Sequence, residues 1–511
     1  MQNNDKKVLL RISNLKQYFP LKGGRFVKAN DGITLDIYEG ETFGLVGESG
    51  CGKSTLGRTI LQLYHQTYGR TMYYGRSLDD LAPKYVIDTV KNLKSRRTKL
   101  RELEQKRDKL EADYAKLSEK EQYAKHGELD TARKLAEDAL LDITKIVGGF
   151  LVVDNLDPVI AAYSKDYAIA HNLSSMEEKR QELQVDVDDA EYAKKNAEDA
   201  SKSGKDAQLQ KAQEKLKQCD DQIAALRAQL DAGRKEIEAL RAPYANDPEF
   251  QKYEVYRDDG IDLARLEYNE MRRLRRDMQL IFQDPYSSLN PRMSVGQIIS
   301  EGMQAHNMIK KKDARMQEMV LKIMDDCGLA PYFLHRFPHQ FSGGQRQRIG
   351  IARALATRPK FVVCDEAVSA LDVSIQAQII NLLLDLKEQQ NLTYMFITHD
   401  LSVVKYISDR VGVMYLGTMV ELAAADEIFH HPIHPYTEAL LNAIPTTDTV
   451  GAKELSILEG DIPSPVNPPK GCKFHTRCKY CTEICTQVVP EWEEVRPNHF
   501  VACHHKLEGK E

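Results

Sequence analysis

A glycine-rich segment near the amino terminus has the residue types needed to hold the phosphates of a nucleotide. It reads Gly47-Glu48-Ser49-Gly50-Cys51-Gly52-Lys53-Ser54 and follows the apolar run 43–46. Glycines let the backbone turn tightly so that N–H groups face phosphate oxygens, and a helix expected from Thr55 adds its positive end. Lys53 supplies a charge and Ser54 a magnesium ligand. Many glycine-rich turns bind nothing, but the strand expected before and the helix after favour a site for a nucleoside triphosphate and Mg²⁺.

Two carboxylates far along the chain could supply hydrolytic chemistry. Asp365 and Glu366 follow the apolar run 361–364, which is typical of a buried parallel strand that delivers acids to its carboxyl end. Asp365 would hold magnesium, directly or through water, and Glu366 would polarise the water that attacks the γ-phosphate. A strand that ends at a solvated acidic turn has the same pattern, but a phosphate loop requires an acidic partner of this kind.

Two more polar side chains follow apolar runs. Gln283 ends the stretch Ile281-Phe282 and could reach both the metal and the attacking water, and His399 follows the stretch 396–398. A histidine after a strand is more often a packed or surface residue, so His399 alone predicts little. The elements that must position these side chains are strands that end close together, and it is the complete set that predicts a hydrolytic site.

A second segment with glycines could also bind an anion. Ser342, Gly343, Gly344 and Gln345 precede the helical pattern 349–355, and a hydroxyl with backbone amides at a helix N-terminus suits a γ-phosphate. The segment 341–348 resembles the signature motif of ABC ATPases, with Phe341 in place of the commoner Leu. The segment 369–372, which ends in Asp372, is similar to the D-loop that contacts the dimer partner in that family.

The resemblance implies an α/β chain with the P-loop ABC ATPase fold, a RecA-like core with antiparallel β and helical subdomains. A chain with both motifs must use them on different nucleotides, so two ATPases would face each other head to tail. Tyr18 matches the aromatic residue that stacks on adenine, although a lone tyrosine is more often structural. The implied catalytic residues are Glu366, His399 and Gln283, and the implied magnesium ligands are Ser54, Gln283 and Asp365. The implied ATP-binding residues are Tyr18, Gly47, Glu48, Ser49, Gly50, Cys51, Gly52, Lys53, Ser54, Thr55, Ser342, Gly343, Gly344, Gln345 and Asp372.

Three further segments narrow the resemblance to the ATPases of oligopeptide and dipeptide permeases, and most of all to their F-type subunit. These segments are 16–20, 282–293 and 461–469. The similarity covers residues 7–86 and 269–505, with Ala367 and Lys479 standing where the family usually or often has Pro. It implies the ATP-hydrolysing motor of a multisubunit importer, peripheral on the cytoplasmic face of the cell membrane. The implied partners are a second ATPase subunit in a heterodimer, two transmembrane permease subunits and an extracytoplasmic peptide-binding protein.

The cysteines are concentrated near the carboxyl terminus. Five of the nine lie between residues 472 and 503, whereas Cys51, Cys219, Cys327 and Cys364 are scattered and are expected to be ordinary buried or helical thiols. No secretory signal or apolar span of membrane length is present, so a reducing compartment is expected and metal remains a reason to gather thiols. Members of the resembling family hold a [4Fe-4S] cluster here, which implies one in this chain. Zn²⁺ or unmetallated thiols are the alternatives for this chain. The implied ligands are Cys472, Cys478, Cys485 and Cys503, with Cys481 an additional thiol.

Residues 87–268 interrupt the resemblance. Apolar residues recur at alternating steps of three and four from Leu93 to Leu117 and from Leu209 to Leu240, which is typical of heptad seams. Because both ends return to one ATPase core, the two seams predict a single antiparallel α-helical coiled-coil hairpin. The stretch 146–170 breaks the heptads and is expected to form a compact tip. Charged residues on the helices are expected to be solvated, with a partner-binding surface at the tip as the alternative.

The predicted domains follow from these segments. Residues 1–86 and 269–430 form the two parts of the ATPase core, 87–268 the coiled-coil insertion, and 431–511 a peptide-permease-type tail with the cysteine cluster.

The insertion has 32 Lys and Arg against 39 Asp and Glu, a net charge of −7 that argues against nucleic-acid binding. The 511-residue chain has a net charge of −5, which suits a cytosolic protein. The alternative function is that of a soluble ABC-type ATPase acting on a non-transport macromolecular partner through its coiled coil, but the single cassette and the tail favour the importer.

Overall fold

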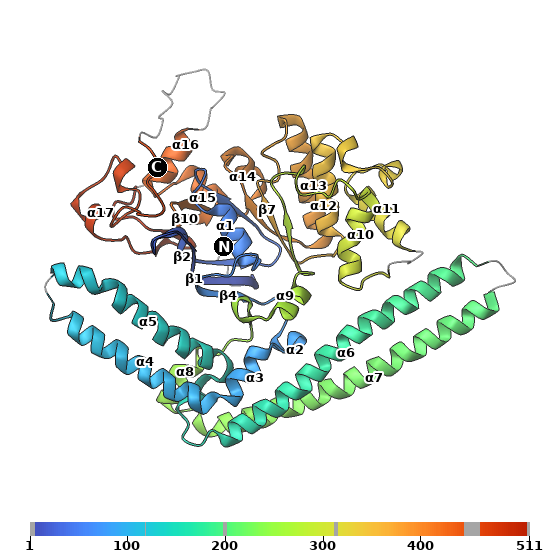
Figure 1. The fold of residues 1–511 in the computed structure, drawn as a ribbon, viewed down its shortest axis with the longest axis horizontal. Helices are drawn as coiled ribbons and strands as arrows, with labels where there is room; N and C mark the ends of the chain where they lie inside the picture. Colours follow the sequence, from blue (N-terminus) through green and yellow to red (C-terminus); the bar gives the residue numbers. More distant parts are fainter. Residues whose placement is uncertain (1–5, 118, 198–201, 311–314, 444–459, 508–511) are drawn as a thin grey trace. The chain divides into compact units, whose positions relative to one another are not determined.

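The computed structural model describes residues 6–117, 119–197, 202–310, 315–443 and 460–507. The chain forms two compact units, of which the first comprises Met1–Gly75 and Met271–Glu511 and the second Arg76–Glu270 (Figure 1). The second unit therefore begins before residue 87, the expected start of the insertion. It does so because two short helices, α2 (Leu78–Leu81) and α3 (Lys84–Lys91), pack against the long helix α6 of the same unit.

The larger sheet of the first unit has the strand order β11-β12-β10-β9-β3-β8-β7-β6 among the described residues. Five neighbouring strands are parallel: β9 (Arg410–Tyr415), β3 (Thr42–Val46), β8 (Thr393–Ile397), β7 (Phe361–Asp365) and β6 (Met278–Ile281). The antiparallel strands β10 (Thr418–Ala424), β12 (His499–Val501) and β11 (Glu493–Arg496) extend the sheet on the β9 side. Every residue of β3, β7, β8 and β9 is buried, as their continuous apolar runs predict.

A smaller antiparallel sheet and a set of helices complete the first unit. The strands β2 (Phe26–Tyr38), β1 (Val8–Pro20) and β4 (Tyr68–Tyr73) pair in that order. The helices are α1 (Lys53–Ile60), α10 (Val295–Ala305), α11 (Met316–Asp326), α12 (Gly343–Leu355), α13 (Val373–Gln390), α14 (Leu401–Ile407), α15 (Ala425–His430), α16 (Pro435–Asn442) and α17 (Glu483–Gln487). One hydrophobic cluster joins five helices, α10 to α14, to strands of the larger sheet, and it contains Phe341, whose ring lies edge-on to Phe333 at 4.9 Å.

The second unit contains two antiparallel helical pairs, so the expectation of a single hairpin was wrong. α4 (Leu93–Tyr114) packs on α5 (Glu119–Val147), and α6 (Asp157–Lys195) packs on α7 (Lys202–Arg241), as Figure 1 shows. The two predicted seams lie on α4 and α7, and each faces a helix adjacent in sequence. Salt bridges across the second pair join Arg180 to Asp220 at 2.6 Å and Arg227 to Glu177 at 2.7 Å. The remaining elements of this unit are α8 (Pro248–Glu254) and β5 (Ile261–Asp262), and α9 (Tyr268–Leu274) spans the boundary with the first unit.

The stretch expected to form a tip instead lies in the hub where the two helical pairs meet. A 3-10 turn, Gly148–Val152, follows α5, and its residue Phe150 belongs to one hydrophobic cluster with residues of α3 to α8. Arg241 at the end of α7 pairs with Glu254, bonds the Tyr163 hydroxyl and lies over the Phe150 ring. A side chain at Gly149 would collide with the Phe250 ring, so this position needs glycine for close packing.

No described helix is long and apolar enough to cross a membrane.

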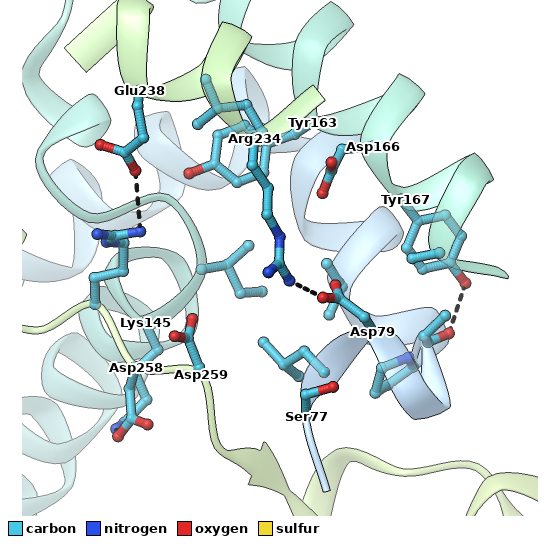
Figure 2. A pocket seen from close by; sticks show the side chains of 18 residues that line it. Ser77, Asp79, Lys145, Tyr163, Asp166, Tyr167, Arg234, Glu238, Asp258 and Asp259 are labelled. Carbon is cyan, nitrogen blue, oxygen red and sulfur yellow. Dashed lines mark hydrogen bonds and ion pairs between the residues drawn. The ribbon is translucent and has the colours of Figure 1, made fainter. Parts of the chain in front are cut away.

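A cavity of ≈ 390 Å³ lies within the second unit, lined by residues of α2, α3, α6, α7 and the segment 257–259. Figure 2 shows Arg234 extending across it to an ion pair with Asp79, while the Tyr167 hydroxyl donates to the Ala82 carbonyl. Asp166 also lines the cavity, and its Oδ1 atom is buried without a hydrogen-bond partner. Burial raises the pKa of the Asp166 carboxyl to about 6. This carboxylate is therefore a local defect in the packing of the helical pair.

Candidate nucleotide site and cysteine-rich tail

The phosphate loop connects β3 to α1 and depends on glycine at two positions. Gly47 has φ 149° and Gly52 has φ 103°. A Cβ at Gly47 would lie 2.2 Å from the Met414 carbonyl oxygen, and one at Gly52 would lie 2.1 Å from that of Ala29. Both the backbone conformation and the close approach of neighbouring strands therefore exclude side chains here. The loop is thus held tightly at both ends, where it leaves β3 and where it enters α1.

Lys53 folds back over this loop. Its Nζ donates to the carbonyl oxygens of Gly47 at 2.7 Å and Glu48 at 3.0 Å, and the side chain is buried. Burial raises the pKa of the adjacent Cys51 thiol, although Lys53 opposes the shift. The ammonium group is therefore kept inside the concave side of the loop, next to the positions where backbone amides meet phosphates.

A carboxylate and a hydroxyl meet beside the loop. Ser54 Oγ donates to Asp365 Oδ1 at 2.5 Å, and Arg58 donates to Asp365 Oδ2 at 3.0 Å. Asp365 is fully buried at the end of β7, so these two contacts fix its orientation. Carboxylate and hydroxyl oxygens are the ligands that Mg²⁺ prefers, and the pair therefore fits a magnesium site. Arg58 has no part in the predicted set, and only the folded structure reveals its contact with Asp365.

Glu366 lies where three strands end. Its amide donates to the Ile397 carbonyl at 2.9 Å, and its φ of 49° is a left-handed conformation that costs energy in a residue with a side chain. Gln283 Nε2 donates to Glu366 Oε2 at 2.6 Å. His399 Nδ1 lies 3.6 Å from Glu366 Oε1. The side chains that follow β6, β7 and β8 therefore converge, because parallel strands bring their carboxyl ends to one edge of the sheet.

These side chains face a cavity of ≈ 540 Å³. Its lining includes nine of the predicted site residues: Ser49, Gly50, Gly52, Lys53, Ser54, Thr55, Gln283, Glu366 and His399. Phe19, Lys28 and Leu416 also line it, and sequence patterns gave no signal for them. The arrangement places a lysine, a hydroxyl and a carboxylate around a space of the size typical for a small-molecule ligand.

Tyr18 does not line this cavity, although its neighbour Phe19 does. Successive residues of a strand point to opposite faces, and the Tyr18 hydroxyl donates to Asp31 Oδ1 at 2.5 Å. Burial and this contact raise the pKa of Tyr18. Burial acts to raise the pKa of Asp31, but Lys473 and Tyr18 outweigh it and lower that pKa to about 2. The adenine-stacking role of Tyr18 stays a prediction.

The signature segment and Asp372 lie outside the cavity lining and cap helices. Ser342 Oγ accepts from the Gln345 amide at 3.4 Å while the Gln345 side chain accepts from the Ser342 amide at 3.2 Å, a capping box at the start of α12. Asp372 accepts from the Ile375 amide at 3.1 Å at the start of α13.

Family models match most of the chain. The model described as "ABC transporter" matches residues 30–250 and 248–369. The chain belongs to the ABC transporter family. A second model, "Oligopeptide/dipeptide transporter, C-terminal region", matches residues 420–485 of this ABC protein, which include part of the cysteine-rich tail.

Curated relatives of this ABC protein carry peptide-transport names. The chain is 34% identical over 498 residues to "Putative oligopeptide transport ATP-binding protein YkfD" of Bacillus subtilis, covering 97% of this chain and 95% of the relative. It is 52% identical over 250 residues to "Oligopeptide transport ATP-binding protein AppF" of the same organism, covering 48% of this chain and 75% of the relative. The solved structure of cbiO1 from Clostridium perfringens, part of the ABC transporter complex cbiONQ, aligns with a TM-score of 0.42 at 16% identity, covering 83% of this chain and 92% of that chain.

The five cysteines of the tail differ in their exposure to solvent. Cys485 is buried, Cys481 is exposed, and Cys472, Cys478 and Cys503 are intermediate. The scattered cysteines Cys51, Cys219, Cys327 and Cys364 are buried, as expected for ordinary thiols. Burial raises the pKa of the Cys503 thiol to about 12, and the charges of Cys472, Cys478 and Cys485 add to the increase. The main chain links two of the four predicted ligand residues, since the Cys472 amide donates to the Cys485 carbonyl at 2.8 Å.

This thiol group does not have the spacing of a single-ion site. Among the residues that the structure describes, no group of three or more His, Cys, Asp or Glu side chains could hold a metal ion. Zinc–sulfur bonds of about 2.3 Å in a tetrahedral site would bring the sulfurs close together. The described side-chain positions therefore show no preassembled site for a metal ion.

Proposed function

We propose that this chain is the ATP-hydrolysing motor subunit of a multisubunit importer of oligopeptides or dipeptides. The observation that carries the hydrolytic part is the convergence of Gln283, Glu366 and His399 on a cavity lined by Lys53 and Ser54. The transported class is inferred from the names of the relatives, which include oligopeptide transport and peptide import ATP-binding proteins.

The proposed chemistry is an in-line attack of water on the γ-phosphate of ATP. Lys53 and the backbone amides of residues 47–55 would bind the β- and γ-phosphates. Glu366 would orient the water and accept its proton, while Gln283 and His399 hold the carboxylate toward the cavity. Ser54, Asp365 and Gln283 would hold Mg²⁺, which neutralises phosphate charge when bound.

The second nucleotide contact requires a second ATPase subunit. The segment Ser342 to Gln345 and Asp372 lie away from the cavity of their own chain. We infer that they complete the site of a facing subunit, with which this chain forms a heterodimer. Two transmembrane permease subunits and an extracytoplasmic peptide-binding protein would complete the importer, with this chain peripheral at the cytoplasmic face of the membrane.

The test of hydrolysis compares two variants of the full chain. Glu366→Gln should bind MgATP as the wild type does but hydrolyse it about 10² to 10⁴ times more slowly, because a general base is lost. Lys53→Ala should weaken binding itself. Equilibrium ATP binding and single-turnover hydrolysis separate the two effects. Near-normal turnover by Glu366→Gln would reject Glu366 as the base.

The proposed cofactor of the tail is a [4Fe-4S] cluster on Cys472, Cys478, Cys485 and Cys503. It is supported by the 2.8 Å hydrogen bond from the Cys472 amide to the Cys485 carbonyl and by the match of residues 420–485 to the peptide-transporter model. Anaerobically purified protein should contain about four irons per chain, as one such cluster requires. Cys481→Ser should retain the iron and Cys485→Ser should lose it. A colourless anaerobic preparation that contains zinc, or no metal, would refute the cluster.

A further inference from the structure

The cysteine-rich tail reaches the phosphate loop through Arg477. Arg477 Nη1 donates to Glu48 Oε2 at 2.6 Å and Nη2 donates to Glu48 Oε1 at 2.9 Å, a bidentate ion pair between residues 429 positions apart. The Arg477 side chain is only 4% exposed and that of Glu48 is 23% exposed. The Glu48 carboxylate raises the pKa of Arg477. A guanidinium in this bidentate geometry forms one of the stronger polar contacts that proteins make.

The backbone of Glu48 is held from the same side. The Glu48 amide donates to the Tyr436 hydroxyl at 2.9 Å. Tyr436, Tyr415 and Phe474 form an aromatic group with ring centroids 4.8 to 5.2 Å apart, and the Arg477 guanidinium lies 5.9 Å from the Tyr415 centroid. Both the side chain and the amide of a residue inside the phosphate loop are therefore fixed by residues of the carboxyl-terminal part of the chain.

A second cation of the tail, Lys473, contacts Leu416, which lines the cavity. The Lys473 side chain is mostly buried, and its Nζ donates to Asp31 Oδ2 at 3.1 Å and to the Leu416 carbonyl at 3.1 Å. Asp31 in turn accepts from the Tyr18 hydroxyl, and Leu416 lines the nucleotide cavity. Burial lowers the pKa of Lys473, while Asp31 opposes this shift. Lys473 and Arg477, four residues apart, thus connect one short loop to Leu416 in the cavity lining and to Glu48 in the phosphate loop.

We propose that the segment Cys472–Cys478, here called the cysteine loop, positions the phosphate loop for ATP. Arg477 acts through Glu48, and Lys473 acts through Asp31. This inference rests on the proposed binding of ATP phosphates by residues 47–55. Neither residue is assigned a role by the family motifs, and neither touches the reacting atoms.

Two physical effects make Arg477 matter for binding. The phosphate loop contains three glycines, so its unbound backbone has many conformations to lose, and an external anchor reduces the entropy lost when ATP binds. Arg477 also neutralises Glu48, whose carboxylate would otherwise stand unpaired beside a triphosphate of the same sign. Removing Arg477 should therefore weaken ATP binding, and removing the Glu48 charge as well should restore much of it.

The test uses a double-mutant cycle in the full chain. Arg477→Met should weaken equilibrium MgATP binding by about 10- to 100-fold, the loss expected for a hydrogen-bonded charged group. The rate constant of hydrolysis at saturating ATP should change less than threefold. Arg477→Lys should lie between Arg477→Met and the wild type. The double variant Glu48→Gln/Arg477→Met should bind at least five times more tightly than Arg477→Met alone.

The controls separate positioning from loss of structure. Lys53→Ala must abolish tight binding, and if it does not, the phosphate-loop assignment fails rather than this inference. If Lys53→Ala behaves as expected while Arg477→Met binds like the wild type, the positioning role is refuted. If Arg477→Met lowers the melting temperature or metal content and Glu48→Gln does not improve its binding, Arg477 only supports the fold of the tail, which also refutes the proposal. Recovery in the double variant supports it.

Discussion

Gln283 and Glu366 are joined by a hydrogen bond of 2.6 Å, although they follow different strands and lie 83 residues apart. The amide of Gln283 donates to the carboxylate expected to accept the proton of the attacking water. His399 approaches the other oxygen of the same carboxylate at 3.6 Å. Glu366 is therefore oriented from both sides, by a neutral donor after β6 and an imidazole after β8.

Replacing Gln283 should slow the chemical step more than it weakens ATP binding. Gln283→Ala removes a donor that holds Glu366, so we expect single-turnover hydrolysis to fall about 10- to 100-fold, within the range for a misplaced general base. MgATP binding should weaken by a smaller factor than hydrolysis slows, because Ser54 and Asp365 remain as the other proposed magnesium ligands. Gln390→Ala, at the exposed end of α13, is the matched control. An unchanged hydrolysis rate in Gln283→Ala would show that this contact does not position Glu366.

The buried His434 should make the first unit sensitive to acid. His434 is 1% exposed, and its Nδ1 accepts from the Tyr436 amide at 3.0 Å. Burial lowers its pKa to about 4, while the nearby Glu421 acts in the opposite direction. Since the unfolded histidine takes up a proton near pH 6.5, the unfolded state binds more protons between pH 6.5 and 4. The free energy of unfolding should therefore decrease as the pH is lowered from 6.5 to 4, by up to about 3 kcal/mol from this group.

This prediction is measured with denaturant unfolding of the full chain at four pH values between 4.5 and 7.5. His434→Asn keeps an acceptor for the Tyr436 amide and removes the titration, so its unfolding free energy should depend less on pH. His430→Asn, at an exposed histidine of α15, should retain the wild-type slope. Equal slopes in the wild type and His434→Asn would contradict the assignment.

The stability of the second unit should depend on pH in the opposite direction because of Asp166. Its pKa rises to about 6 on folding because of burial, so the folded state binds more protons than the unfolded state between pH 4 and 6. Stability should therefore decrease as the pH rises through this window. Asp166→Asn should stabilise the unit at pH 7 by about 1–2 kcal/mol, a value reduced for partial exposure of the carboxylate. Asp231→Asn on the facing helix α7 is the control, and no gain relative to it would refute the prediction.

The convergence of Gln283, Glu366 and His399 at one edge of the sheet was predictable from sequence, whereas the contacts outside this edge were not. Apolar runs that end in Gln283, Glu366 and His399 predict strand ends, and parallel strands bring those ends together. Arg477 belongs to no such pattern, because its partner Glu48 is 429 positions away and only tertiary folding joins them. A signal was available in its charge: an arginine beside cysteines in a tail that packs on the core needs a partner.

The topology of the second unit was missed for a different reason. A heptad seam shows that a stripe of a helix is buried but not which helix covers it. The helices that cover the predicted seams use small residues, such as Ala132 and Ala136 on α5 and Ala162 and Ala170 on α6, which are buried without standing out in the sequence. The sequence pattern therefore did not indicate that each seam packs against the helix next to it in the chain.

The two-pair arrangement leads to a final prediction about the outer part of α6 and α7. The hub holds Phe150, Phe250 and Arg241 near the start of α6 and the end of α7, far along these helices from residues 188–195 of α6 and 202–212 of α7. Replacing 188–212 with a four-residue Gly-Ser linker should therefore leave the melting temperature of the second unit within a few degrees of the wild type. Phe150→Ala should lower it strongly, because truncating a buried phenylalanine costs about 3–5 kcal/mol. Calorimetry and ATPase assays of both full-length variants test this, and aggregation of the shortened chain with a stable Phe150→Ala would show that the outer helices, rather than the hub, hold the unit together.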